Sequence, residues 1–203
     1  MEFTPLVSGE GCYMSRIRFT SARSVFESFP ELARKSTVAP TDDPAIVFLK
    51  DLAANHKFEE AVAFCAHLLP RREAVWWGCA SVRSFLNDIP QSRAAPLVAA
   101  ETWVHNPSDA NRLHALQIGT RSSDSDCLTW LALGAGWAGG MLSTVPSPPL
   151  PVPQYLTARA IRVAVLLAFP LISASERERC KSACIAGGIR LAEQGFDQGA
   201  DGF

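Results

Sequence analysis

Residues 70-PRREAVWWGCASVRSFL-86 place two tryptophans side by side in a segment with helical spacing. Neighbouring residues of a helix point about 100° apart, so one buried face cannot hold both rings. The apolar stripe of this helix consists of Val75, Cys79, Val82 and Leu86. Trp76 lies beside that stripe, whereas Trp77 lies almost opposite to it. Trp77 therefore needs a second layer, which is either another helix of the same chain or a partner.

The two alternatives lead to different functions. In the first, the 70–86 helix is central and is packed on several sides, with Gly78 and Ala80 admitting close neighbours. In the second, the helix carries an exposed patch of tryptophan and arginine, the residue types most enriched at interface hot spots. The candidate partner-binding residues of this patch are Arg72, Glu73, Trp76, Trp77 and Arg83.

The rest of the chain repeats helical spacing between turn and capping residues. The predicted segments are 22–29, 43–56, 58–69, 91–106, 109–121, 124–142, 154–172 and 174–195. The expected caps are Ser21 or Thr20 for the first segment, Asp42 or Asp43 for the second, and Asp124 or Asp126 for the segment that begins at 124. No stretch shows the period-two alternation of a β-hairpin.

We therefore predict an all-α fold of about eight helices, in which neighbours such as 43–56 and 58–69 form antiparallel helical hairpins. An irregular single-domain bundle over residues 14–198 is the expected architecture, and a helical-repeat stack stays open. The proline-rich stretch 146-PSPPLPVP-153 is expected to connect the bundle to a C-terminal hairpin. Residues 1–13 are expected to be a poorly ordered extension or vector-derived, and residues 199–203 a frayed tail.

Composition narrows the class of protein. The chain has 203 residues, 48% hydrophobic and 19% charged, with a formal net charge of −1. Nucleic-acid-binding proteins are usually basic, and this net charge does not fit that class. The longest apolar run, 160–172, is short for a membrane span and carries Arg162 and Pro170. Without a secretory signal pattern, the six cysteines are expected to be reduced thiols in a cytoplasmic protein.

The sequence offers little support for a catalytic or metal-binding motif. The four histidines lack metal-ligand spacing, and the glycines of 134-GAGWAGG-140 have no basic residue beside them, so we expect no metal and no cofactor. Glu101 and His105 lie four residues apart on one helix face and form the best acid–base pair available, with His114 downstream. An enzyme or toxin with a cryptic site built from these three residues is therefore an alternative.

Four stretches together resemble a known group of proteins: RFTSARSVFESFP, APTDDPAIVFLKDL, FEEAVAFCAHLLP and LLPRREAVWWGCASVR. They are similar to an uncharacterised family of bacterial all-helical proteins over roughly residues 14–198, with REAVWW as the most specific string. Genes of that family tend to lie near components of the type VI secretion system. The resemblance implies a cytoplasmic adaptor or chaperone-like accessory protein, whose partner would be a secretion effector or tip component, and it implies no catalytic residue.

We therefore expect a non-enzymatic protein–protein interaction module that binds neither nucleic acid nor membrane. A self-associating structural subunit is a further alternative. The apolar segments 127–142 and 155–172 could supply its interface, although burial in the core accounts for both equally well.

Overall fold

A computed structural model describes residues 18–86, 88–141 and 150–195. The N-terminal helices in these ranges are α1 (Ala22–Ser28), α2 (Pro30–Ala33), α3 (Ala45–Ala54), α4 (Phe58–Leu68) and α5 (Arg71–Phe85). After the 3-10 helix η1 (Gln91–Arg93) follow α6 (Ala95–His105), α7 (Asp109–Arg121) and α8 (Cys127–Gly136). The C-terminal part contains α9 (Tyr155–Ala168), η2 (Phe169–Leu171) and α10 (Arg177–Gln194). The described chain is thus all-α, as predicted, and its only pairing of β type consists of two isolated bridges.

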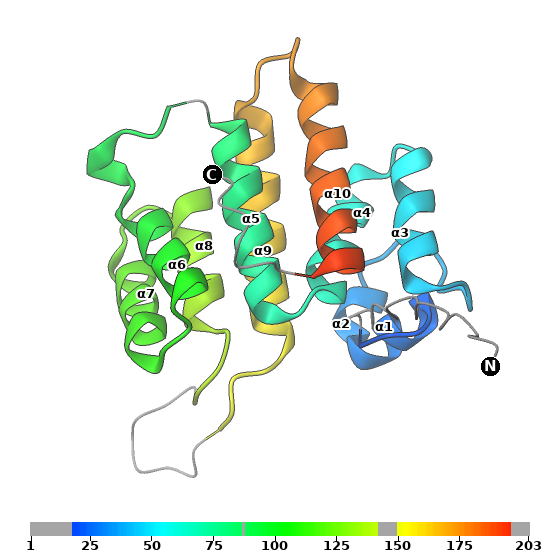
Figure 1. Cartoon of the computed structure of the whole chain (residues 1–203), viewed down its shortest axis with the longest axis horizontal. Coiled ribbons are helices and arrows are strands. Elements are labelled where there is room, and N and C mark those ends of the chain that lie inside the picture. Colours follow the sequence, from blue (N-terminus) through cyan, green and yellow to red (C-terminus); the bar gives the residue numbers. More distant parts are fainter. Residues whose placement is uncertain (1–17, 87, 142–149, 196–203) are drawn as a thin grey trace, which may run out of the picture.

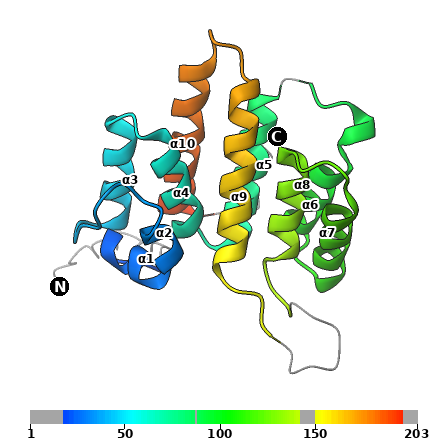
Figure 2. The ribbon, with the colours of Figure 1, turned by 180° about the vertical axis from the view of Figure 1, so that it is seen from behind.

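Two helices, α5 and α9, run through the middle of the molecule (Figure 1). Helices α6, α7 and α8 pack on one side of this pair, and α4, α10 and the N-terminal helices lie on the other side. The reverse view shows α9 in front, with α8 beside it (Figure 2). A continuous set of buried side chains extends from α1 to α10, so the helices share one hydrophobic core.

Three of the described helices begin at a residue whose side chain caps them. Side-chain oxygens of Ser21, Ser108 and Asp126 accept hydrogen bonds from backbone N–H groups in the first turns of α1, α7 and α8. The prediction for α3 was wrong, because Pro44 rather than an aspartate occupies its cap position. Asp42 instead pairs with Arg23 of α1, and the two side chains approach to 2.6 Å. The sequence pattern also missed α2, a single turn that Pro30 starts directly after α1 ends.

The second layer over Trp77 is α10 of the same chain. The indole Nε1 of Trp77 donates a hydrogen bond of 2.9 Å to the backbone carbonyl of Cys184, and the side chain is only 1% exposed. Trp76 is partly buried at the edge of the core. The first alternative for the 70–86 helix is therefore the correct one: this helix is central and is covered from within the chain.

Helices α8 and α9 lie unusually close together where glycine permits it. A methyl group at Gly134 of α8 would lie 2.7 Å from Cδ1 of Ile161 of α9, closer than packed carbons tolerate. The contact fixes α8 and α9 as neighbours along the side of the molecule seen in Figure 2. No described helix combines the length and apolarity needed to cross a membrane.

The predicted extension 1–13, the tail 199–203 and residues 146–149 of the proline-rich connector lie outside the described residues. Leu150–Pro153 of that connector are described. Val152 donates a backbone hydrogen bond of 3.1 Å to Gly140, which joins the end of the connector to the segment that follows α8.

Candidate functional site

The patch predicted on α5 is not one exposed surface. Trp77 lies in the core under α10, and Glu73 is also buried, with 9% of its surface exposed. Placing Trp77 in an exposed patch is therefore wrong, because the helix that covers it comes from the other end of the chain. Arg72 and Trp76 are partly exposed and Arg83 is exposed.

The two arginines of the predicted patch hold α6 against α5. Arg72 Nε donates a hydrogen bond of 2.7 Å to the backbone carbonyl of Val104, close to the end of α6 where carbonyls lack helical partners. Arg83 forms a bidentate ion pair with Glu101 of α6, and Nη2 lies 2.7 Å from Oε2. The hydrogen bond that Arg83 donates to Glu101 raises the pKa of Arg83 above its ordinary value. Both side chains thus connect α5 to α6 within the protein.

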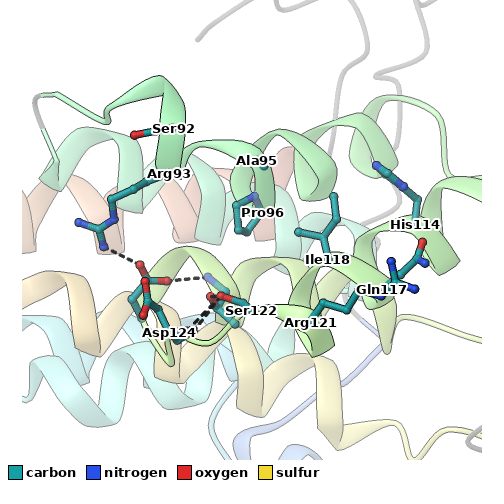
Figure 3. Close-up of a pocket in the computed structure, with 12 residues that line it drawn as sticks. Ser92, Arg93, Ala95, Pro96, His114, Gln117, Ile118, Arg121, Ser122 and Asp124 are labelled. Atoms are coloured by element: carbon teal, nitrogen blue, oxygen red, sulfur yellow. Dashed lines mark hydrogen bonds and ion pairs between the residues drawn. The ribbon is translucent and has the colours of Figure 1, made fainter.

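The residues of the cryptic-site alternative are not brought together. Glu101 is engaged by Arg83, and His105 is exposed at the end of α6. His114 lines a polar hollow of about 440 Å³ between the start of α6 and the end of α7, to which neither Glu101 nor His105 contributes (Figure 3). The hollow that His114 lines therefore does not include the predicted acid–base pair.

Two charged residues of that hollow, Arg93 and Asp126, stabilise the first turn of α8. Arg93 Nη2 lies 2.7 Å from Oδ2 of Asp126, and Oδ1 of Asp126 accepts the backbone N–H of Thr129 (Figure 3). Burial alone would raise the pKa of Asp126, but the hydrogen bonds from Thr129 and Arg93 outweigh it and lower that pKa. Asp126 therefore acts as a charged helix cap whose neutralising partner is Arg93.

A different surface has the composition of a binding site. On the outward side of α8, Trp130 and Trp137 are partly exposed, and their rings contact each other edge to face with centroids 6.4 Å apart. The adjoining side of α9 presents three apolar side chains that are not fully buried: Leu156, Val163 and Leu167. We call these five residues the α8–α9 face. Leu167 is 43% exposed, although α9 is apolar around most of its circumference and would be expected to be covered.

An apolar hollow continues this face at the end of α9. Its volume is about 410 Å³, and its wall includes Leu167, Leu171 and Ile89. The charged residues Asp88, Arg93 and Asp126 also line it. Leu171 is 64% exposed. Exposed apolar residues that gather at one place, unlike single ones, indicate a contact surface.

The cysteines and the remaining polar clusters offer no comparable site. In the described residues, no three side chains of histidine, cysteine or acid types are grouped as metal ligands would be. Burial raises the pKa of the Cys184 thiol to about 12, and it raises the pKa of Cys65 and Cys79 as well. Thiols in this state are poor nucleophiles, because the thiolate is the reactive form.

Comparison with known proteins assigns the chain to a family. A family of unknown function (DUF6931) matches residues 48–192, which is more than half of the chain, and the chain therefore belongs to that family. No curated protein and no solved structure matches the chain. The expected membership of an uncharacterised family is confirmed.

Proposed function

We propose that this member of the DUF6931 family is a non-enzymatic protein–protein interaction module, which acts as a cytoplasmic adaptor or chaperone-like accessory protein. The observation that carries the proposal is the α8–α9 face, which combines two tryptophans in mutual contact on α8 with three incompletely buried aliphatic side chains on the neighbouring helix α9. Tryptophan is the residue type most enriched at binding hot spots, which lie in desolvated patches at the centre of an interface.

The tryptophans of this face are held in place before any partner binds. Trp130 Nε1 donates a hydrogen bond of 3.2 Å to the hydroxyl of Ser125, and its ring contacts Trp137. Aromatic side chains that are already ordered lose little conformational entropy on binding, which favours affinity. The α8–α9 face thus combines a large apolar contact area with side chains that are already ordered.

We further propose that the partner is a component of a bacterial type VI secretion system, such as an effector or a tip protein. This step is supported by the sequence resemblance around REAVWW alone. An adaptor that holds an apolar segment of an effector would need an exposed apolar face of this kind.

Affinity capture with two matched variants tests the proposal. Leu167→Asp adds a charge to the face, and Val98→Asp adds the same charge on α6, where Val98 is 49% exposed. We expect the wild-type chain and the Val98→Asp variant to retain the same protein from a lysate of the source cell. The Leu167→Asp variant should lose it by about tenfold or more, because a charge buried at an interface lacks a counter-charge.

Two results would contradict the proposal: equal retention by all three chains, or equal loss in both variants. Mass spectrometry of the retained protein decides the second step, since a partner unrelated to secretion would refute the type VI assignment. Light scattering on the purified chain decides whether the occupant is a second copy. A dimer that Leu167→Asp dissociates would establish the self-associating alternative.

A further inference from the structure

The formal charges that α8 and α9 themselves carry all have one sign. The carboxylates of Asp88 and Asp126 line the hollow at the Leu167 end of the face, where Asp126 is paired with Arg93. Between Asp126 and Glu176 the sequence contains no aspartate or glutamate. In the same stretch the only basic residues are Arg159 and Arg162, both on α9. Helices α8 and α9 therefore present an apolar surface whose only formal charges are positive.

Arg159 is the cation available to a partner. It is exposed one helical turn before Val163, on the open side of α9, and no carboxylate among the described residues forms an ion pair with it. Arg162 is partly buried on the side of α9 that approaches α4. Burial chiefly lowers the pKa of His67, hydrogen bonds from Thr37 outweigh burial and lower that of Glu60, and the charge of Arg162 adds to both shifts. Arg159 thus lies at the rim of the face, whereas the charge of Arg162 acts mainly on the residues of α4 at the inner side of α9.

We infer that the α8–α9 face binds an amphipathic helix whose apolar stripe is flanked by carboxylates, so that an acidic side chain of the partner meets Arg159. The inference rests on the proposed function and specifies the chemistry of its partner. A third helix laid along α8 and α9 would bury apolar residues of both, as helices do within this bundle. Complementary charge at the rim would then fix the partner's orientation and favour it over basic helices.

Other occupants fit the charges less well. A second copy joined through the same face would bring a second Arg159 to a surface on which neither α8 nor α9 carries a carboxylate. A nucleic acid or an anionic membrane surface requires a cluster of basic residues, whereas this face has one, Arg159, and the whole chain has a net charge of −1.

The test uses two synthetic peptides of about 18 residues, long enough to form helix, with the same leucine stripe on an alanine background. One peptide carries glutamates beside the stripe and the other carries lysines at the same positions. Fluorescence anisotropy of the labelled peptides, titrated with the full chain, measures both affinities. We expect the glutamate peptide to bind about fivefold to tenfold more tightly at low salt, and this preference to shrink as salt screens the exposed charges.

Charge reversal locates the effect. Arg159→Glu should reverse the preference, so that the lysine peptide binds more tightly. Arg190→Glu on α10 is the matched control, because Arg190 is exposed and forms no ion pair with a described residue. In that variant the glutamate peptide should still bind more tightly than the lysine peptide.

Each other outcome has a definite meaning. Equal binding of the two peptides, or a preference that Arg159→Glu leaves unchanged, overturns the inference while the proposed interaction function stands. Binding of neither peptide also overturns the inference, and the affinity capture with Leu167→Asp and Val98→Asp then decides the proposed function separately. Binding of the chain to phosphatidylglycerol vesicles as tightly as to the glutamate peptide would identify a membrane surface in place of a protein helix, and would overturn the inference.

Discussion

Trp76 and Trp77 are neighbours in sequence but belong to different environments. Trp77 is enclosed between α5 and α10, and its indole N–H satisfies the carbonyl of Cys184. Trp76 is partly buried at the edge of the core and stays partly open to solvent. A buried tryptophan whose N–H is hydrogen-bonded stabilises the folded state through the apolar area that it buries and through that hydrogen bond.

Trp77→Ala should lower the free energy of unfolding by about 3–5 kcal/mol, the range for removing a large aromatic side chain from a packed core. Trp76→Ala is the control and should cost clearly less, because its ring is only partly removed from water. Urea denaturation followed by circular dichroism measures both values. A Trp77→Ala variant as stable as the wild type would contradict the placement of Trp77 in the core.

His67 is a buried base that folding keeps neutral. Burial lowers its pKa from 6.5 to about 4, and the charge of Arg162 acts in the same direction. Its Nδ1 lies 2.8 Å from the carbonyl of Ala63, whereas its Nε2 is 3.8 Å from the Glu31 carboxylate, beyond hydrogen-bond distance.

The stability of the protein should therefore depend on pH through His67. Between about pH 6.5 and pH 4 the unfolded chain binds a proton at this residue and the folded chain does not. The free energy of unfolding should fall by about 1.4 kcal/mol per unit as the pH decreases through this window, and His67 should contribute no slope above it. Urea titrations of the wild type and of His67→Gln at several pH values isolate this contribution as their difference. Parallel pH profiles for the two proteins would refute it.

At the scale of single residues, the sequence argument placed Trp77 correctly on its helix and left its cover undecided. A helical wheel describes one helix, whereas the covering residue, Cys184, lies more than a hundred positions later in the chain. The α8–α9 face did have a signal, the absence of acids between Asp126 and Glu176. Burial in a core produces the same apolar composition. Only the exposed fraction of residues such as Leu167 therefore distinguishes an exposed binding face from a core segment.

At the scale of elements, the contact of α10 with α4 and α5 depends on one small residue. A methyl group at Gly188 would overlap Sγ of Cys65 and would lie 3.1 Å from Nε1 of Trp77. Its neighbour Gly187 has no atom within 4 Å of the corresponding position. The two glycines share one helix and differ only in what surrounds them.

Gly188→Ala should therefore destabilise the protein by about 1–3 kcal/mol, because α10 must move outward or the side chains of Cys65 and Trp77 must shift. Gly187→Ala should instead leave stability unchanged or raise it by up to about 1 kcal/mol, since alanine is the better helix former. Thermal unfolding of the two variants beside the wild type measures the contrast. Equal effects of both substitutions would show that α10 does not pack closely at Gly188.

Helix boundaries were predictable wherever a local capping interaction determines them. Ser21, Asp126 and the turn before Asp109 mark helix starts within a few residues of chain, so the pattern alone is sufficient. The cap of α3 was predicted wrongly because Asp42 has a longer-range partner in Arg23. Local propensity fails in such cases, since an ion pair with a residue of another helix competes for the side chain that would form the cap.

At the scale of the whole molecule, the order of the helices in space could not be derived from the sequence. The number and class of helices follow from spacing, but the central position of α5 and α9 depends on contacts between segments far apart in the chain. The described part of the chain has buried cysteines in four of its helices, and these can report whether that arrangement unfolds as one unit. They include Cys65 in α4, Cys79 in α5, Cys127 in α8 and Cys184 in α10.

We expect these four thiols to react together. Because one core joins the helices that carry them, unfolding should be cooperative, and each thiol should become accessible at the same urea midpoint. Short pulses of iodoacetamide at increasing urea, in a Cys12→Ser background and read by peptide mass spectrometry, give a midpoint for each cysteine. If Cys127 became reactive at a clearly lower urea concentration than Cys65, α6–α8 would form a separate unit that opens by itself. Coincident midpoints would mean that α5 and α9 join the two sides of the bundle into a single cooperative domain.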